Sequence, residues 1–149
     1  MLGSLYKKRA FITVFVAAEV LPGIQAGHAR LEVVPRAVRA GWLREIGLKA
    51  GEEKRLFESL SRSVGLGEAS SIAAAKTRGY VFASDDRVAR AEAAALGVVL
   101  TGTLGILAKA VRAGVCDLAA ADGHLARMIE AGFFSPVRSI RELISLKEG

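Results

Sequence analysis

The feature that most restricts the possible fold is a regular alternation between residues 67 and 114. Three segments with helical spacing of their apolar residues, 68–78, 86–96 and 103–113, each end at a glycine. Two short and largely apolar runs, 80–84 and 98–101, separate these segments. Such continuous runs are typical of parallel strands that helices cover on both faces. The alternation therefore predicts an α/β fold with three layers, α/β/α, around a mostly parallel central sheet.

The flanking sequence predicts further elements of the same two kinds. Pro22 and Gly23 are expected to stop a first helix, because proline cannot continue the hydrogen-bond ladder. Gly65 is expected to end an amphipathic helix whose apolar residues share one face. Residues 42–48 alternate in part between apolar and polar side chains, which favours an edge strand. These predicted elements are strands at 10–14 and 42–48 and helices at 15–23, 50–65, 120–132 and 135–146.

Composition restricts the class of protein and its compartment. The chain has 149 residues, which suits one domain over residues 1–149. The apolar run at 11–21 is far shorter than the roughly 20 residues that span a bilayer, so we expect no contact with a membrane. There is no secretory signal pattern at the start, and the single Cys116 cannot form an internal disulfide. Both features favour a cytoplasmic protein.

The net charge of +6 favours an anionic partner, and nucleic acid is the natural candidate. Lys7, Lys8 and Arg9 form a basic run that is either an RNA contact or a solvated end of the chain. The sequence contains no phosphate-binding loop, zinc-ligand spacing, nucleophile elbow or dinucleotide fingerprint. The chemistry must therefore come from other residues.

Acidic residues stand where a parallel sheet places its sites. Asp85 and Asp86 directly follow the run at 80–84, and Glu68 opens the preceding helix. Sites in such sheets form at the carboxyl ends of the strands. Two interpretations stay open for the aspartates: one of them, or Ser84, caps the next helix, and the other is left for a different role.

Glu68 has the same ambiguity, because an acidic residue also stabilises the first turn of a helix. Glu19, in the first predicted helix, has the alternative of an ordinary solvated side chain. Taken together, these carboxylates suit Mg²⁺ or Mn²⁺, which take oxygen ligands and keep several waters. Such an ion activates water and neutralises the charge on a phosphate during cleavage of a phosphodiester.

Four segments of the sequence resemble the PIN-domain ribonucleases, and in particular the branch of predicted nucleic-acid-binding proteins. They keep the order of that family and cover most of the chain from about residue 10 to 115. The segments are "ITVFVAAEV", "LGEASSIAAA", "VFASDDRVARAEAAALG" and "VVLTGTLGILAKAVRAG".

The resemblance implies an activity, a cofactor and partners. The implied activity is Mg²⁺- or Mn²⁺-dependent cleavage of single-stranded RNA, often by the toxin of a toxin–antitoxin pair. The partners would be RNA and an antitoxin protein, and the chain would form a homodimer or a higher homo-oligomer. The implied catalytic and metal-binding residues are Glu19, Glu68, and Asp85 or Asp86, with Arg90 and Thr103 close to the substrate.

The sequence departs from the family at its start. Family members open with a central strand that ends in an aspartate, whereas "MLGSLYKKRA" resembles the tail of the first helix that follows. One acidic residue and one central strand would then be missing. Either the true start lies upstream, or residues 10–17 shift into the gap, or a neighbouring chain covers it. The alternative function is a degenerate PIN-like domain that binds RNA or a protein without cleavage.

Overall fold

The computed structural model describes residues 1–145, in which helices alternate with short strands. These residues divide into a larger unit, 6–100, and a smaller unit that joins residues 1–5 to those from 101 onward. Each unit has its own buried core and is described by itself. That residues 1–149 form a single domain stays a prediction. None of the described helices combines the length and the apolar character that crossing a bilayer requires.

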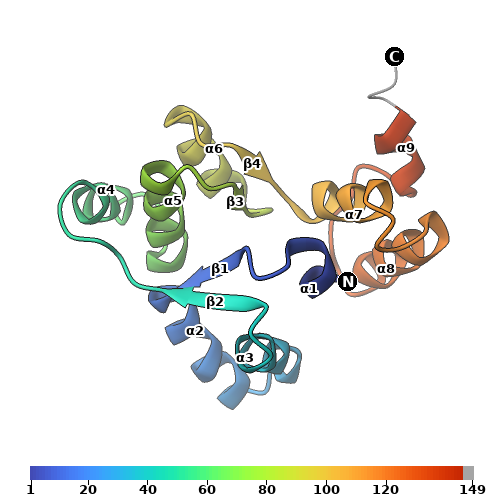
Figure 1. Ribbon diagram of the computed structural model, residues 1–149, viewed down its shortest axis with the longest axis horizontal. Coiled ribbons are helices and arrows are strands. Elements are labelled where there is room, and N and C mark those ends of the chain that lie inside the picture. Colours follow the sequence, from blue (N-terminus) through green and yellow to red (C-terminus); the bar gives the residue numbers. More distant parts are fainter. Residues whose placement is uncertain (146–149) are drawn as a thin grey trace. The chain divides into compact units, whose positions relative to one another are not determined.

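The larger unit contains the elements from β1 to α6 (Figure 1). Before it, α1 (Leu2–Tyr6) opens the chain, and after it β4 (Leu100–Thr101) leads into the smaller unit. The elements between are β1 (Ala10–Thr13), α2 (Val14–Gln25), the 3-10 helix η1 (Ala29–Glu32), α3 (Val33–Arg39), β2 (Leu43–Ile46), α4 (Glu52–Leu60), α5 (Leu66–Arg78), β3 (Phe82–Ala83) and α6 (Arg87–Ala95).

β1 and β2 are parallel neighbours, with Phe11 opposite Arg44. Both strands were predicted from the sequence, and both are slightly shorter than the predicted runs. The chain passes from β1 directly into α2, where the Thr13 hydroxyl accepts a hydrogen bond of 3.3 Å from the Val16 N–H and caps the helix. In Figure 1, α2 and α3 lie on the same side of this strand pair.

The prediction that Pro22 and Gly23 stop the first helix is wrong, because α2 continues to Gln25 and contains both residues. The Pro22 carbonyl still accepts a hydrogen bond of 2.9 Å from Ala26, so the last turn is closed. A Cβ atom on Gly23 would lie only 2.5 Å from a methyl group of Leu31 in η1. The glycine therefore allows η1 to pack against α2, and this contact outweighs the local stop signal.

β3 and β4 pair with each other, and the Phe82 N–H donates a hydrogen bond of 2.9 Å to the Val99 carbonyl. Phe82 and Val98 are buried, whereas Val81 and Val99 are 56% and 65% exposed. In the described residues this pair therefore buries one face, and the three-layer arrangement stays a prediction. The apolar runs extend beyond the two hydrogen-bonded residues of each strand.

The strands of the described residues form two separate pairs, β1–β2 and β3–β4. The molecule is thus a mixed helix and strand structure with short sheets, and the expected gap lies between the pairs. Residues 10–17 do not shift into this gap, because β1 pairs with β2. An upstream start and a covering neighbour stay predictions.

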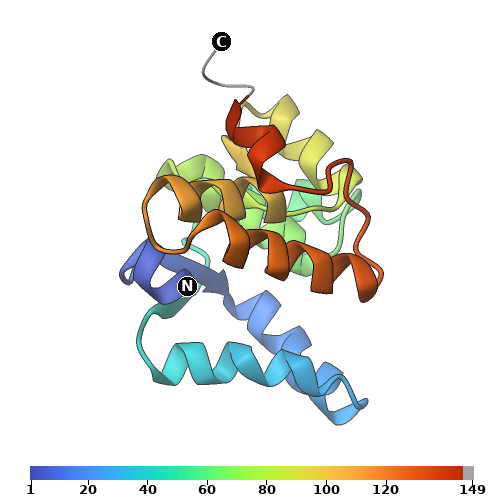
Figure 2. The same ribbon diagram turned by 90° about the vertical axis from the view of Figure 1, so that its right-hand side faces the viewer.

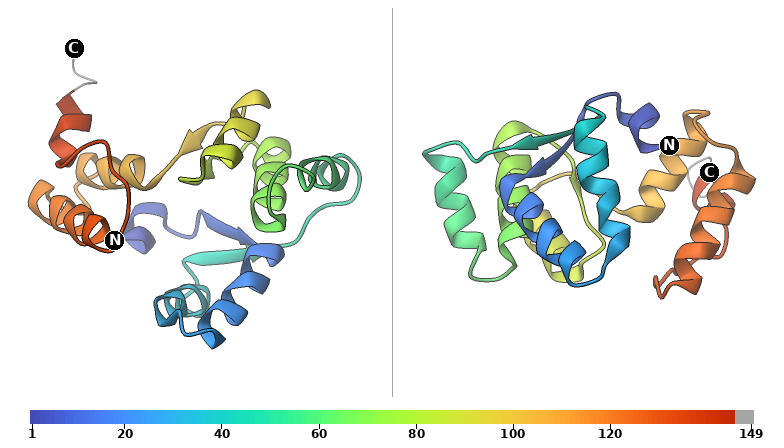
Figure 3. Two further views of the ribbon diagram at one scale, coloured as in Figure 1. Left: turned by 180° about the vertical axis from the view of Figure 1, so that it is seen from behind. Right: turned by 90° about the horizontal axis from the view of Figure 1, so that it is seen from below.

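The core of the larger unit is built around α5, whose buried face is rich in alanine. Small side chains on this face allow close approach of α2, α4 and α6, which all contact α5. Figure 3 shows α4 and α5 side by side. Ile72 is fully buried at the centre of this core. The other buried members are Leu60, Ala69, Ala73, Ala75, Phe82, Ala89, Ala93 and Val98.

The apolar face predicted for residues 50–65 is confirmed, because Leu56, Phe57, Leu60 and Val64 all pack into this core. The predicted end of that helix is wrong. α4 ends at Leu60, and Gly65 is instead the N-cap of α5, with extended backbone angles. A glycine between two helical segments can end the first helix or cap the start of the second. Because residues 61–64 form a turn, Gly65 caps the second.

The smaller unit consists of α7 (Thr103–Arg112), α8 (Leu118–Glu130) and α9 (Ile140–Ser145), together with most of α1. Figure 2 shows α7, α8 and α9 packed together. The carboxylate of Asp122 in α8 accepts hydrogen bonds from the Ser139 hydroxyl and the Ile140 N–H, which holds the start of α9. α9 begins later than predicted, and residue 146 of the predicted helix lies outside the described residues.

Candidate functional site

Two side chains of the predicted acidic set lie at the start of α5. Gly67 is a buried residue in the first turn of this helix. A Cβ atom on Gly67 would lie 3.0 and 3.1 Å from the two carboxylate oxygens of Glu19 in α2. The Glu19 carboxylate therefore lies against the backbone next to Glu68, although the two glutamates are far apart in the sequence.

A buried pair of hydroxyl groups positions α2 against α5. The Oγ1 of Thr13 and the Oγ of Ser70 are 2.6 Å apart, and the two residues are 2% and 0% exposed. Ser70 donates its proton to the Gly67 carbonyl at 2.9 Å, so Thr13 is the donor in the bond between the hydroxyls. This network fixes the start of the helix that carries Glu19 to the first turn of α5.

Glu68 turns back over the N-cap of its own helix. A Cβ atom on Gly65 would lie 2.6 Å from the Oε2 of Glu68. Gly65 has no side chain to cap α5, and a glutamate at the third helical position is placed to reach back to the cap. The predicted place of Glu68 in the first turn is confirmed. Its carboxylate and that of Glu19 both lie near the positive end of the helix dipole.

Asp85 and Asp86 follow β3, as predicted, and have different surroundings. The Oδ1 of Asp86 accepts a hydrogen bond of 2.8 Å from the Ala89 N–H, which makes Asp86 the N-cap of α6. The Ser84 hydroxyl accepts a bond of 3.1 Å from the Asp86 N–H and tightens the same turn. Of the three residues that the sequence left open as the cap, the structure selects Asp86. Asp85 directly precedes it, and both aspartates are exposed.

The residues predicted near the substrate, Arg90 and Thr103, also begin or support helices. The Arg90 guanidinium donates a hydrogen bond of 2.8 Å to the Ser84 carbonyl, so it ties α6 to the end of β3. Thr103 is the first residue of α7 and belongs to the smaller unit. Substrate binding by either residue stays a prediction.

The described residues contain no group of three or more histidine, cysteine, aspartate or glutamate side chains arranged to hold a metal ion. What the structure brings together is the Glu19 carboxylate and the first turn of α5, where Glu68 lies. Two carboxylates are a donor set that fits Mg²⁺, which often takes only one or two protein carboxylates and otherwise binds water and substrate phosphate. The participation of Asp85 or Asp86 stays a prediction.

Sequence reasoning missed a buried ion pair in the same unit. Glu53 is only 3% exposed and forms a two-pronged contact with Arg78, with nitrogen-to-oxygen distances of 2.6 and 3.0 Å. The Thr77 hydroxyl and the Lys49 N–H also donate to its carboxylate. The hydrogen bond from Arg78 lowers the pKa of Glu53 to about 2, together with the bonds from Thr77 and Lys49 and against the effect of burial.

This ion pair joins the start of α4 to the end of α5 and borders a cavity of about 150 Å³. Arg78 also donates a hydrogen bond of 2.6 Å to the Gly47 carbonyl after β2. The carboxylate and the guanidinium satisfy each other, so we interpret the cluster as structural. The only signal in the sequence was a pair of acidic residues at a helix start, which is common on solvated helices.

A second missed feature is a stack of side chains beside this cluster. The rings of Phe11 in β1 and Tyr80 before β3 are stacked, with centroids 4.9 Å apart and planes within 4°. The guanidinium of Arg44 lies over the Phe11 ring, 5.7 Å from its centroid. Tyr80 also neighbours Arg78, whose pKa is raised mainly by the hydrogen bond to Glu53 and to a lesser extent by Tyr80.

Comparison with known proteins gives one match. A family sequence profile described as a PIN domain matches residues 1–148, almost the whole chain. No curated protein and no solved structure matches the chain.

Proposed function

Because the chain belongs to the PIN-domain family, which has a nuclease-type fold, we propose that it is a metal-dependent endoribonuclease that cleaves single-stranded RNA. The observation that carries this proposal is the position of the Glu19 carboxylate against Gly67, at the helix start that also holds Glu68. A carboxylate from α2 thus lies at the first turn of the helix that carries a second one, and carboxylates are the ligands that Mg²⁺ and Mn²⁺ prefer.

In this proposal Glu19 and Glu68 hold Mg²⁺ or Mn²⁺ together with one aspartate. That aspartate is Asp85 or Asp86, which follow each other at the end of β3; an oxygen of Asp86 also caps α6. The bound ion would supply an activated water and neutralise charge on the phosphate. The chain itself orients these groups: the Thr13–Ser70 pair fixes α2 to α5, and the Asp86 cap and Arg90 fix the turn that presents Asp85.

The remaining parts of the proposal extend from family membership. They are a three-layer sheet completed by one more strand, a cytoplasmic location, a role as the toxin of a toxin–antitoxin pair with an antitoxin protein as partner, and a homodimer or higher homo-oligomer. The two separate strand pairs support the first of these, because no strand among the described residues joins β1–β2 to β3–β4.

The test is cleavage of single-stranded RNA with Mn²⁺ by the wild-type chain and two variants, Glu68→Gln and the double variant Asp85→Asn with Asp86→Asn. Each variant is expected to lose at least about a hundredfold in rate, because changes in groups that only support metal ligands already cost roughly 10–100-fold. Glu58→Gln, an exposed glutamate on α4, is the matched control and should cleave at the wild-type rate. Full activity in both site variants would refute the metal site.

A second candidate function is an RNA-binding or protein-binding domain without cleavage. The observation that favours it is that Asp86 caps α6 and Glu68 folds over the N-cap of α5, so both carboxylates have structural uses. RNA binding by the wild-type chain with no cleavage at any Mg²⁺ or Mn²⁺ concentration would support this alternative.

A further inference from the structure

The stack of Arg44, Phe11 and Tyr80, here called the aromatic column, follows from the register of β1 and β2. Phe11 and Arg44 are directly opposite each other in the parallel pair, so their side chains project on the same face. Tyr80 reaches the same place from the end of α5 and stacks on the Phe11 ring. Three segments far apart in the sequence thus build one stack of side chains.

The outer part of the column is accessible. Tyr80 is 37% exposed, Arg44 is exposed, and Phe11 is half-buried. The column is also held in place, because Tyr80 neighbours Arg78 and Arg78 is fixed by its bonds to Glu53 and to the Gly47 carbonyl. Tyr80 is thus a partly exposed ring held at the surface, and aromatic rings stack favourably on other flat groups.

Positive charge surrounds the column. Lys7, Lys8 and Arg9 are exposed and directly precede β1, which carries Phe11. Lys7 and Lys8 both have a positive φ, at 45° and 67°, a backbone region that residues with a side chain rarely adopt. Strained backbone of this kind is found most often at active sites and ligand-binding sites. With Arg44, this gives four cationic side chains on or next to the strand that holds the column.

Aromatic faces combined with cations are the chemistry by which proteins bind single-stranded nucleic acid. Bases stack on the rings without sequence preference, and Lys and Arg contact the backbone phosphates. A duplex offers no free base face, so this surface discriminates in favour of a single strand. We propose that the aromatic column binds single-stranded RNA, with a base stacked on Tyr80 and phosphates on Arg44 and the basic run at residues 7–9.

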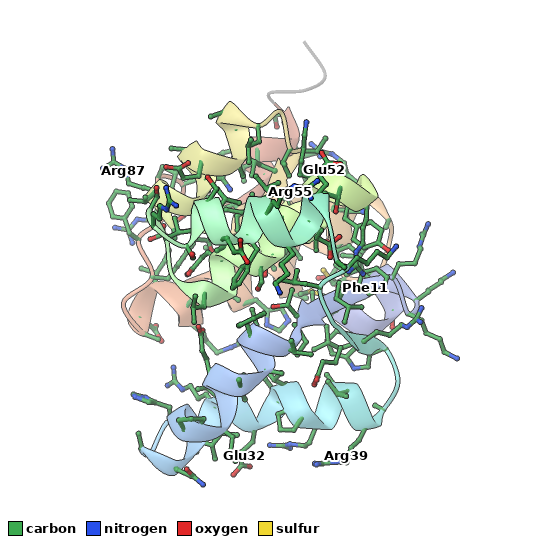
Figure 4. The ribbon with its side chains drawn as sticks, turned by 90° about the vertical axis from the view of Figure 1, so that its left-hand side faces the viewer. Phe11, Glu32, Arg39, Glu52, Arg55 and Arg87 are labelled. Carbon is green, nitrogen blue, oxygen red and sulfur yellow. The ribbon has the colours of Figure 1, made fainter. Side chains whose placement is uncertain are left out.

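The choice of RNA over DNA rests on the proposed function, whereas the stacking itself does not. Figure 4 shows Phe11 and Arg87 at opposite sides of the view, and Arg87 marks the start of α6, next to the proposed metal-binding aspartates. Phe11 of the column therefore lies away from the start of α6, which the proposed metal-binding aspartates precede. Binding can be measured in EDTA, where metal-dependent cleavage does not occur.

The experiment measures binding of a labelled, unstructured RNA of about ten nucleotides by fluorescence anisotropy in EDTA. Tyr80→Leu removes the ring and should weaken binding roughly tenfold or more, whereas Tyr80→Phe keeps the ring and should bind within about twofold of wild type. Arg44→Gln should reduce the slope of log affinity against log salt by about 0.7. Arg55→Gln, an exposed arginine on α4, is the charge-matched control and should leave the slope unchanged.

Three results would overturn the proposal. The first is equal affinity of the wild-type chain for the single strand and for its duplex. The second is wild-type affinity in Tyr80→Leu. The third is no RNA binding by the wild-type chain, which is the result expected if this surface binds a protein partner. Thermal unfolding of each variant shows that it is folded. The nuclease proposal is tested separately. Glu68→Gln should lose cleavage but bind RNA in EDTA as the wild type does. If the wild-type chain binds RNA and never cleaves it, only the nuclease proposal is refuted.

Discussion

At the scale of single residues, the structure separates side chains that looked alike in the sequence. Asp85 and Asp86 are adjacent carboxylates, but only Asp86 caps α6. Glu52 and Glu53 are also adjacent, and only Glu53 is buried. A helix or turn directs neighbouring side chains in different directions, so Asp86 meets the Ala89 N–H and Glu53 meets Arg78.

Glu53 gives a prediction about stability and pH. Its pKa is lowered from 4.5 to about 2, so its ionised form stabilises the folded state above pH 4.5 and this contribution is lost as the pH falls towards 2. Glu53→Gln should therefore cost about 3 kcal/mol at pH 7. The deficit relative to wild type should shrink as the pH falls below 4.5. Urea unfolding at pH 7 and at pH 3 measures it.

The matched control for that prediction is Glu52→Gln, which removes the same charge at an exposed position beside the same cavity. It should change the free energy of unfolding by no more than about 0.5 kcal/mol. A deficit in Glu53→Gln that is the same at both pH values would contradict the lowered pKa.

At the scale of elements, local signals located the helices well and the strands only approximately. Gly79, Gly97 and Gly114 were predicted to end helices, and all three have a positive φ directly after a helical segment. This signal is reliable because the left-handed conformation is costly for other residues. Pro22 and Gly65 were misjudged, because packing against η1 and the turn after α4 decide their roles.

The contact between α2 and α5 gives a prediction at this scale. In Gly67→Ala the new methyl group would lie 3.0 Å from a Glu19 oxygen and should displace that carboxylate. The melting temperature should be unchanged or higher, because alanine is a better helix former than glycine. The rate of Mn²⁺-dependent RNA cleavage should fall about tenfold or more, because a small displacement of a catalytic group is costly.

Gly47→Ala is the matched control for Gly67→Ala. A Cβ atom at Gly47 meets open space, so this variant should keep the wild-type rate. Unchanged cleavage in Gly67→Ala would show that the Glu19 carboxylate does not have to lie at the start of α5 for activity.

At the scale of the whole molecule, the described residues contain two separate cores. Ile72 is fully buried in the core of the larger unit, and Leu125 is fully buried in that of the smaller unit. The sequence predicted a single domain, because a chain of 149 residues suits one domain. Composition alone does not distinguish one core from two of similar character.

The two cores give a prediction for thermal unfolding. Ile72→Ala and Leu125→Ala should each destabilise their own unit by about 2–5 kcal/mol, because each leaves a cavity. If the units unfold independently, calorimetry will show two transitions, and each variant will shift only one of them. A single transition that both variants shift equally would support the single domain expected from the sequence.

The sequence by itself located α2 and α4 to α8 approximately, placed the starts of β1 and β2 to within one residue, and identified the acidic residues that follow or open those elements. These are local properties, since turn glycines, caps and apolar periodicity act within a few residues. Only the tertiary structure decided that Glu19 meets the first turn of α5, that Glu53 pairs with Arg78, and that Phe11, Tyr80 and Arg44 form a column. Each of these contacts joins segments far apart in the chain, and the register and close packing that create them exist only once the backbone has folded.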